Sequence, residues 1–334
     1  MAVAAKAGEV LVRAEGLEKR FPVTRNVFLR PVAFVHAVDG VSFDVREGET
    51  LGLVGESGCG KTTTGKLLVK LLEPDAGKVR FRLDGGEQDV VSLSGGALRR
   101  FRRHVQMVFQ DPYESMNPRR TVYDTVAEPL VVQRVGSARE RGERVAEMLA
   151  LVGLTPPRLY EFRYPHELSG GQRQRAALAR ALVLGPTFIV ADEPTSMLDV
   201  SVRTGVMKLM LGLQERLGIS YLYITHDLAV ARYLCDRIAV MYLGKIVEVA
   251  DTEELLSHPL HPYTRALLSA VPEPDPTHVP PPVEIRGGVR SAVNPQPRCR
   301  FYERCPMAAS VCEESDHPPL EDKGGNHYVA CYRV

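Results

Sequence analysis

The chain of 334 residues lacks a net charge excess, a long apolar run and, before Cys299, more than two cysteines. Its 42 basic and 41 acidic side chains nearly cancel, which gives no overall signal for nucleic acid or a membrane surface. No apolar stretch is long enough to span a bilayer, and Lys6 and Glu9 interrupt the start where a secretory signal is apolar. We therefore expect a cytosolic chain whose six cysteines are thiols or metal ligands rather than disulfides.

Short apolar runs alternate with helical periods along the chain. TLGLVG at 50–55 precedes GKTTTGKLLVKLL at 60–72, and TFIVAD at 187–192 follows QRQRAALARALVLG. This alternation predicts an α/β core with strands buried between helices. Near the start, EVLVRAEGL and VSFDVREGE alternate apolar and polar residues, which predicts an antiparallel layer beside that core.

Two further segments differ from this core. Residues 112–168 hold few strand-like runs, and RERGERVAEMLALVG places apolar residues on one helical stripe that ends at Gly153, so a helical insertion is predicted. Residues 272–285, PEPDPTHVPPPVEI, are too rich in proline for a helix or a central strand. They predict an extended linker into a cysteine-bearing tail.

The stretch GESGCGKT, Gly55–Thr62, fits G-x-x-x-x-G-K-[ST] between a predicted strand and a predicted helix. Glycines let such a loop curl its N–H groups around phosphate, Lys61 reaches the β- and γ-phosphates, and Thr62 ligates Mg²⁺. A plain glycine turn is the alternative, which the Lys-Thr pair in register disfavours. The residues assigned to nucleotide binding in this stretch are Gly55, Ser57, Gly58, Cys59, Gly60, Lys61, Thr62 and Thr63.

Further polar residues follow predicted strands. Asp192 ends the strand before Glu193 and suits Mg²⁺, while Glu193 suits a general base; the alternative is an acidic cap before Pro194. Gln110 and His226 also follow β-rich runs, the usual position of catalytic groups in a parallel sheet. Taken singly, each is more often a polar side chain with an ordinary partner.

The stretch LSGGQRQR at 168–175 predicts a second phosphate site. Ser169 can cap a helix whose first turn is Gly170 and Gly171, and such a helix offers a bare N-terminus to an anion. The three residues alone are a weak signal and more often form a loop.

Taken together, these motifs occur in the order and approximate spacing of the ATP-binding cassette (ABC) family, which residues 9–250 resemble. The resemblance implies that two cassettes bind ATP head to tail, between the phosphate loop of one and the signature of the other. It implies that Lys61, Gln110, Glu193 and His226 act in hydrolysis, with Thr62, Gln110 and Asp192 around Mg²⁺. The remaining residues implied to contact ATP or to cross the interface are Phe21 on adenine, Ser169, Gly170, Gly171, Gln172 and Asp199.

A narrower resemblance adds the stretch FQDPYESMNPR, the long segment 22–36 and HPLHPYTRALLSAVP at 258–272. These are similar to the ATPase subunits of oligopeptide and dipeptide importers. The resemblance implies a nucleotide-binding domain over 9–257, with a helical subdomain at about 112–184, and a C-terminal region over 258–334. It also implies a related but distinct second ATPase, two permease subunits, an extracytoplasmic substrate-binding protein and a place on the cytoplasmic face of the membrane. The transported substrate lies outside what this chain specifies.

The tail has the spacing C-x5-C-x6-C-x18-C, formed by Cys299, Cys305, Cys312 and Cys331. Structural zinc sites usually begin with closer pairs, but four thiolates suit zinc or a [4Fe–4S] cluster almost equally. Four unrelated thiols are the third possibility. Some importer ATPases carry a [4Fe–4S] cluster on such a tail, so the resemblance favours the cluster.

The same tail holds His317 and His327, which we expect at the surface rather than as ligands. Since the linker separates the tail from the ATP motifs, we expect the tail to take no part in hydrolysis.

An alternative function is a soluble ABC ATPase that acts on DNA or ribosomes. Such proteins are expected to have a second cassette, a coiled-coil insertion or a basic surface. The local run RRFRRH at 99–104 is basic, and we interpret it as a solvated helix face or a site near lipid headgroups rather than a nucleic-acid contact.

Overall fold

The computed structural model describes residues 8–25, 31–83, 85–270, 285–288 and 292–334, and the chain forms two compact units. The first unit combines Met1–Val91 with Tyr223–Val334, and the second is Ser92–Leu222. The expected proline-rich linker falls almost entirely on residues 271–284, outside the described residues. Among the helices that the structure describes, none is long and apolar enough to cross a bilayer.

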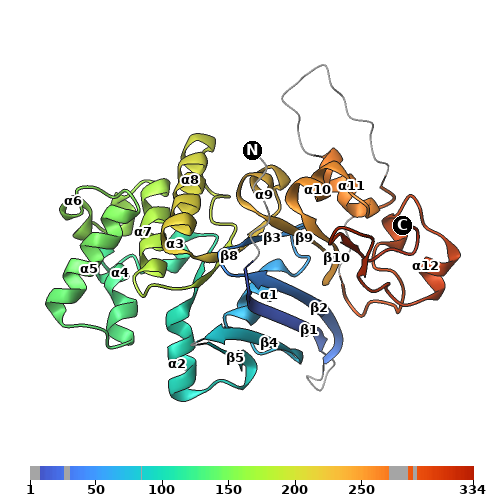
Figure 1. Ribbon diagram of the computed structural model, residues 1–334, viewed down its shortest axis with the longest axis horizontal. Helices are drawn as coiled ribbons and strands as arrows, with labels where there is room; N and C mark the ends of the chain where they lie inside the picture. Colours follow the sequence, from blue (N-terminus) through green and yellow to red (C-terminus); the bar gives the residue numbers. More distant parts are fainter. Residues whose placement is uncertain (1–7, 26–30, 84, 271–284, 289–291) are drawn as a thin grey trace. The chain divides into compact units, whose positions relative to one another are not determined.

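An antiparallel sheet of four strands opens the first unit (Figure 1). Its order is β2 (Pro31–Arg46), β1 (Val10–Arg25), β4 (Ala76–Leu83) and β5 (Gly86–Asp89). Alternate residues of β1, such as Val12 and Ala14, are buried, which is the pattern of a sheet with one face on a core. The antiparallel layer expected from the sequence is confirmed. Within the expected insertion, residues 22–25 and 31–36 lengthen β1 and β2.

The second sheet of this unit carries the α/β core. In it β3 (Thr50–Val54) pairs in parallel with β9 (Arg237–Tyr242), and β10 (Lys245–Asp251) runs antiparallel to β9. All five residues of β3 are buried, as expected for a strand covered on both faces. The C-terminal tail adds β12 (Tyr328–Val329) to β10 and then β11 (Glu321–Asp322), so the tail belongs to the sheet. The helices and 3₁₀ turns of the unit are α1 (Lys61–Leu68), η1 (Val90–Ser92), α9 (Leu228–Leu234), α10 (Thr252–Ser257), α11 (Pro262–Ser269), η3 (Tyr302–Arg304) and α12 (Ser310–Glu314).

The second unit is largely helical, and helices lie between residues 112 and 168, where the sequence predicts them, although the unit itself is wider and includes strands. Its helix α5 (Ala138–Leu151) is followed, as expected, by Gly153 in the left-handed region at φ 78°. In this unit β6 (Val105–Val108) pairs in parallel with β7 (Phe188–Asp192), and β8 (Ser220–Thr225) lies next to β7 at the end of the unit. The other helical elements are α2 (Gly95–His104), α3 (Pro112–Ser115), α4 (Val122–Val132), α6 (Arg158–Glu161), η2 (Pro165–Glu167), α7 (Gly170–Leu182) and α8 (Val200–Leu217).

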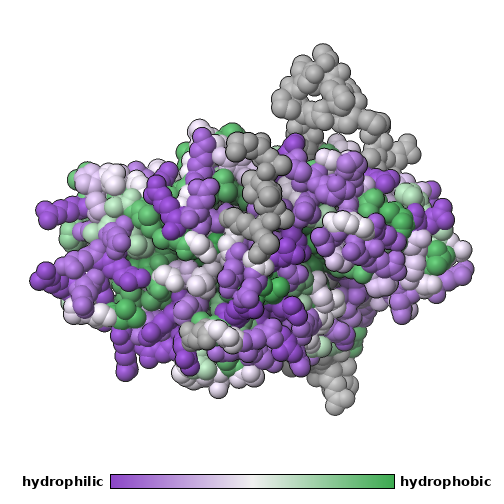
Figure 2. Space-filling view, in the orientation of Figure 1, coloured by the Kyte–Doolittle hydropathy of each residue, from purple (hydrophilic) through white to green (hydrophobic). Residues whose placement is uncertain are grey.

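The surface visible in Figure 2 is mostly hydrophilic and carries small apolar areas. In the second unit, several large apolar side chains are more than half exposed. These are Val131, Val132, Leu159, Phe162, Met197 and Val200. In the first unit Val23, Val32 and Leu71 are also more than half exposed, and apolar side chains exposed singly are common at protein surfaces.

A buried carboxylate, Glu248 of β10, joins the tail to the rest of the first unit. Its oxygens accept hydrogen bonds from the N–H groups of Leu260 (2.6 Å) and His261 (3.1 Å), and they lie 2.7 Å from Nε2 of His327. Glu248 is fully buried and the His327 side chain is 4% exposed. The expectation that His327 lies at the surface is therefore wrong, because the imidazole is the partner that this buried carboxylate needs.

The hydrogen bond to Glu248 raises the pKa of His327 above its ordinary value of 6.5. The folded state thus binds this proton more tightly than the unfolded state does, so the contribution is complete below pH 6.5 and is lost as pH rises through the raised pKa. We expect His327→Gln to lower the free energy of unfolding by about 1–3 kcal/mol at pH 6 and by less at pH 8. Denaturant unfolding at both pH values checks this.

The control is His258→Gln. His258 also faces a glutamate, Glu254, at 3.3 Å, but its side chain is 71% exposed, so its loss is expected to have little effect. Equal pH dependence of stability in wild type and His327→Gln contradicts the assignment.

Candidate functional site

The loop between β3 and α1 has the form expected of a phosphate loop. Gly58 and Gly60 are left-handed at φ 78° and 111°. A Cβ on Gly60 would lie 1.9 Å from the carbonyl oxygen of Ala37, and one on Gly55 would lie 2.1 Å from that of Met241. Glycine is therefore required at these two positions by backbone packing. Ser57 and Gly58 at the tip of the loop are exposed.

Lys61 opens α1 and turns back into this loop. Its Nζ donates to the carbonyl oxygens of Gly55 (2.7 Å) and Glu56 (2.9 Å), and the residue is 5% exposed. The ammonium is thus fixed at the loop, where it can exchange carbonyl oxygens for phosphate oxygens. Thr62 and Thr63 follow in the first turn and are half-buried.

The side chain of Cys59 packs inward. The residue is 3% exposed, and burial raises the pKa of its thiol, an effect that Lys61 partly offsets. Cys59 therefore contributes its backbone rather than a reactive thiolate to the loop.

Two more residues that were predicted to contact ATP, Phe21 and His226, belong to the first unit. Phe21 lies in β1 opposite Val35, with the Lys19 ammonium 5.9 Å from its ring centroid. His226 is exposed directly after β8, and Asp227 beside it caps α9 by accepting from the N–H groups of Ala229 and Val230. His226 is therefore held at a strand-to-helix turn, as expected for a group at a strand end.

The second unit holds the expected carboxylates. Asp192 ends β7 and is 4% exposed, and Glu193 follows it at φ 44°. A left-handed backbone is uncommon for glutamate and is a form of strain found at functional sites. Nε2 of Gln110 donates to Oε2 of Glu193 at 3.4 Å. Sequence analysis selected Gln110 and Glu193 separately, and the fold brings them into contact.

The signature stretch opens α7 as predicted. The Ser169 hydroxyl accepts from the N–H of Gln172 (3.3 Å), whose side-chain oxygen accepts from the N–H of Ser169 (3.0 Å). A Cβ on Gly171 would lie 2.4 Å from Cγ1 of Val202, so this glycine allows α8 to approach the start of α7. Gly170 is half-buried, and Asp199, the residue before α8, is exposed.

An arginine of the signature helix contacts the segment after Gln110. The Arg173 guanidinium lies 3.9 Å from the ring centroid of Tyr113, and its Nη1 donates to the Tyr113 hydroxyl (2.8 Å) and to the carbonyl oxygen of Leu168 (2.5 Å). Cation–π stacking and one hydrogen bond, to the Tyr113 hydroxyl, join α3 to α7.

The C-terminal region also contacts the phosphate loop, which the sequence analysis did not foresee. The N–H of Glu56 donates to the hydroxyl of Tyr263 (2.9 Å), and the carboxylate of Glu56 accepts from Nη1 and Nη2 of Arg304. The expected separation between the tail and the ATP motifs is therefore wrong.

The four tail cysteines lie in this same region. Cys299, Cys305 and Cys312 are buried and Cys331 is half-buried. Burial and the neighbouring cysteines raise the pKa of Cys299 to about 11. Within the described residues, no three His, Cys, Asp or Glu side chains are arranged to hold a single metal ion. His317 is half-buried rather than at the surface, and its Nδ1 accepts from the N–H of Arg300 at 3.3 Å.

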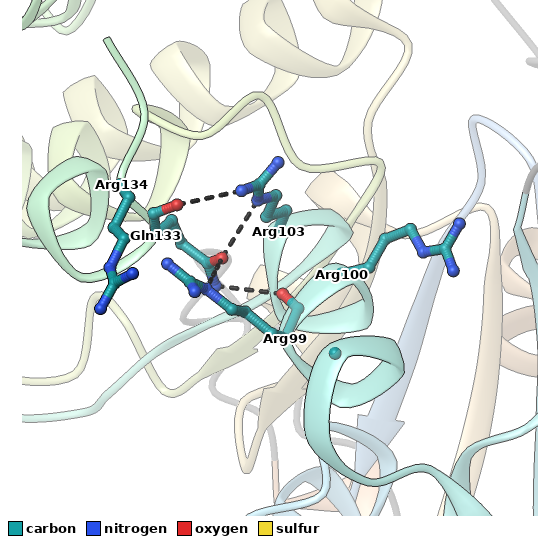
Figure 3. A pocket seen from close by; sticks show the side chains of 6 residues that line it. Arg99, Arg100, Arg103, Gln133 and Arg134 are labelled. Atoms are coloured by element: carbon teal, nitrogen blue, oxygen red, sulfur yellow. Dashed lines mark hydrogen bonds between the residues drawn. The ribbon is translucent and has the colours of Figure 1, made fainter. Parts of the chain in front are cut away.

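A basic pocket lies in the second unit (Figure 3). It has a volume of about 370 Å³ and is lined by Gly96, Arg99, Arg100, Arg103, Gln133 and Arg134. Nε of Arg99 (3.2 Å) and of Arg103 (3.0 Å) both donate to Oε1 of Gln133, which is 6% exposed. The prediction of a solvated helix face is thus only partly correct, because the guanidinium groups of Arg99 and Arg103 hydrogen-bond to Gln133 at the end of α4.

Comparisons with known proteins agree with this geometry. Residues 38–196 match the ABC transporter family, and residues 247–312 match the C-terminal region of oligopeptide/dipeptide transporters. The chain is 46% identical to the oligopeptide transport ATP-binding protein AppF of Bacillus subtilis, over 97% of each protein. It is 44% identical to the dipeptide transport ATP-binding protein DppF of Haemophilus influenzae, again over 97% of each.

Solved structures show the same fold. The structure of a dimeric ATP-binding cassette in a post-hydrolysis state, bound to ADP and Pi, superposes with a TM-score of 0.62 and 29% identity. It covers 72% of this chain and 99% of that one. CbiO1 of Clostridium perfringens, part of an ABC transporter complex, has a TM-score of 0.62 at 27% identity and covers 75% and 92%.

Proposed function

Because the chain belongs to the family of ATP-binding proteins of ABC transporters, we propose that it is the motor subunit of an importer for dipeptides or oligopeptides. Its activity is the ATP hydrolysis of this family. The observation that carries the peptide assignment is the similarity to AppF and DppF over almost the whole chain, including the transporter-specific C-terminal region. A peptide is the proposed cargo, but its length is set by other subunits.

We propose that Glu193 is the general base that takes a proton from the attacking water. Its contact with Gln110 and its left-handed backbone support the role, because both fix the carboxylate at the end of β7. Gln110 orients the same water, and His226 contacts the γ-phosphate. Lys61 stabilises the charge that develops on the phosphate oxygens.

We assign Mg²⁺ to Thr62, Gln110 and Asp192. These residues offer hydroxyl, amide and carboxylate oxygens, the ligands that this ion prefers, and Gln110 meets Glu193 through its nitrogen rather than its oxygen. Mg²⁺ would neutralise phosphate charge. Phe21 stacks on adenine, and the phosphates are bound by Gly55, Ser57, Gly58, Cys59, Gly60 and Thr63.

We propose that two cassettes bind ATP head to tail. Ser169, Gly170, Gly171 and Gln172 then meet the nucleotide of the partner. Met197 is 63% exposed and Val200 is 77% exposed on either side of Asp199, which suits burial against a second cassette. We expect the partner to be a related but distinct chain.

The remaining subunits are proposed on the same basis. Two membrane permease subunits and an extracytoplasmic substrate-binding protein complete the importer, and this chain lies on the cytoplasmic face of the membrane. Exposed Leu159 and Phe162 in the second unit, and the link between Tyr113 and Arg173, suit transmission of cassette movement to a permease. We propose that residues 9–257 form the nucleotide-binding domain, with a helical subdomain at about 112–184, and that residues 258–334 form the C-terminal region.

We also propose that Cys299, Cys305, Cys312 and Cys331 carry a [4Fe–4S] cluster. The support is that the four thiols lie in one small region, where burial first and neighbouring cysteines second raise the pKa values of Cys299 and Cys331, a rise that a cationic centre would reverse. They are not arranged around a single ion, whereas a cluster accepts ligands that are further apart. The cluster would add order to a segment with little secondary structure.

Replacing the proposed base tests the hydrolysis mechanism. Glu193→Gln is expected to lower kcat by about 100-fold or more, while ATP binding and ATP-dependent dimerisation persist. Steady-state ATPase assays and size-exclusion chromatography with ATP measure the two properties. The control is Glu215→Gln, an exposed glutamate of α8 that leaves turnover unchanged. Turnover at the wild-type rate in Glu193→Gln removes the assigned base.

Purification from membranes tests the importer assignment. Affinity-tagged protein from mildly solubilised membranes is expected to bring two multi-span subunits and a second ATPase, identified by mass spectrometry. Recovery with ribosomes or DNA instead, at the same salt concentration, supports the alternative ATPase, which the comparisons do not favour.

Anaerobic purification tests the cluster. We expect a brown protein with about four iron atoms per chain, and loss of the colour in Cys305→Ser. The control is Cys235→Ser, a buried cysteine outside the tail, which keeps the colour. A colourless protein with stoichiometric zinc, or with no metal, rejects the cluster.

A further inference from the structure

The phosphate loop carries a carboxylate, Glu56, that an arginine of the C-terminal region holds with two hydrogen bonds. Nη1 of Arg304 lies 2.9 Å from Oε2 and Nη2 lies 3.0 Å from Oε1. The Arg304 side chain is 8% exposed and that of Glu56 is 25% exposed. A bidentate ion pair of this kind fixes the orientation of both side chains and also places opposite charges together.

Aromatic rings surround the ion pair and hold the arginine in place. The guanidinium lies 5.6 Å from the ring centroid of Tyr242 and 6.0 Å from that of Phe301. Tyr242, Tyr263 and Phe301 pack against one another with centroids 4.6–5.5 Å apart. Because the Tyr263 hydroxyl accepts from the N–H of Glu56, the same cluster fixes both the backbone and the side chain of this residue.

The position of Glu56 makes its charge important for nucleotide binding. The carbonyl oxygens of Gly55 and Glu56 hold Nζ of Lys61, so the carboxylate belongs to the loop that receives a triphosphate. An uncompensated carboxylate there repels the phosphates and weakens binding. Arg304 supplies the compensating charge, and the hydrogen bonds to Glu56 raise the pKa of Arg304, which keeps it charged.

We propose that Arg304, with Tyr263, is a positioning residue of the ATP site that neutralises Glu56 and fixes the phosphate loop from the C-terminal region. The carbonyl oxygen of Arg304 accepts from the N–H of Arg286, and Cys305 follows it directly. The residue that holds the loop is therefore directly continuous with the cysteine-bearing segment. The proposal rests on the ATP binding in the proposed function and adds a role that the separated tail was not expected to have.

A charge cycle tests the proposal in the full chain, with ATP affinity, KM and kcat measured for wild type, Arg304→Met, Glu56→Gln and the double variant. Arg304→Met is expected to raise Kd and KM for ATP by about tenfold with little change in kcat, because it exposes the carboxylate charge. The loss of ATP affinity in Arg304→Met is expected to be smaller at high salt, because ions screen the carboxylate charge. Glu56→Gln binds ATP at least as well as wild type, and the double variant recovers to within about threefold, because neither charge remains.

A purely structural role for Arg304 predicts the opposite pattern, in which the double variant binds as weakly as Arg304→Met or more weakly. That result, or wild-type affinity in Arg304→Met, overturns the proposal. If Arg304→Met does not fold, Arg304→Lys replaces it in the same cycle. Lysine keeps the positive charge but cannot form the bidentate pair with Glu56. An increase in the Kd for ATP of about threefold is therefore expected, and Glu56→Gln should remove this increase.

The control is Arg298→Met. Arg298 belongs to the same segment and pairs with Glu303 and Glu313, away from the loop, so its loss tests general damage to the tail. Its Kd for ATP is expected to stay within about twofold of wild type. If wild type itself neither binds nor hydrolyses ATP, the proposed function fails. If wild type binds ATP and the cycle shows no coupling, only the role of Arg304 fails.

Discussion

The backbone of residues 55–60 must curl tightly enough for its N–H groups to meet phosphate oxygens, and the first unit is built around this requirement. Carbonyl oxygens of Ala37 and Met241 occupy the space that side chains at Gly60 and Gly55 would need. The N–H of Gly244 donates to the carbonyl oxygen of Cys59 from the turn between β9 and β10. The loop is thus enclosed by segments that are distant in sequence, and it keeps its shape because they do.

The C-terminal region completes this enclosure. Glu248 anchors the start of α11 and the last strands through hydrogen bonds to Leu260, His261 and His327, and α11 in turn presents Tyr263 to the loop. The tail therefore belongs to the unit that holds the phosphate loop. A buried carboxylate of this kind costs free energy to desolvate, and three partners offset that cost.

Two of the groups proposed for hydrolysis, Gln110 and Glu193, lie in the second unit on short, well-fixed segments. Glu193 follows a fully buried strand and contacts Gln110, while Ser169 and Gln172 cap each other at the start of α7. Arg173 joins that helix to Tyr113, three residues after Gln110. The proposed base and the helix proposed to meet a partner's nucleotide are thus connected within one unit, which suits a motor that couples closure to hydrolysis.

Several features of the fold and of the candidate site were predictable because they depend on local chemistry. The phosphate loop, the Ser169 cap and the glycine after α5 follow from residue type and spacing, because each depends on neighbours in the chain. The antiparallel layer and the helical insertion follow from apolar periodicity in the same way. The order of the motifs, taken together, was enough to identify the family.

Contacts between distant segments were not predictable from these patterns. Nothing in the spacing of Arg304 or Tyr263 indicates that Glu56 is their partner, and His327 was expected at the surface because its partner, Glu248, is 79 residues away. The sequence by itself indicated the groups that we propose for phosphate binding and hydrolysis, since those predictions depend on short motifs. Only the tertiary structure decided that the tail holds the phosphate loop, because that contact depends on how β9, β10 and the C-terminal strands pair in space.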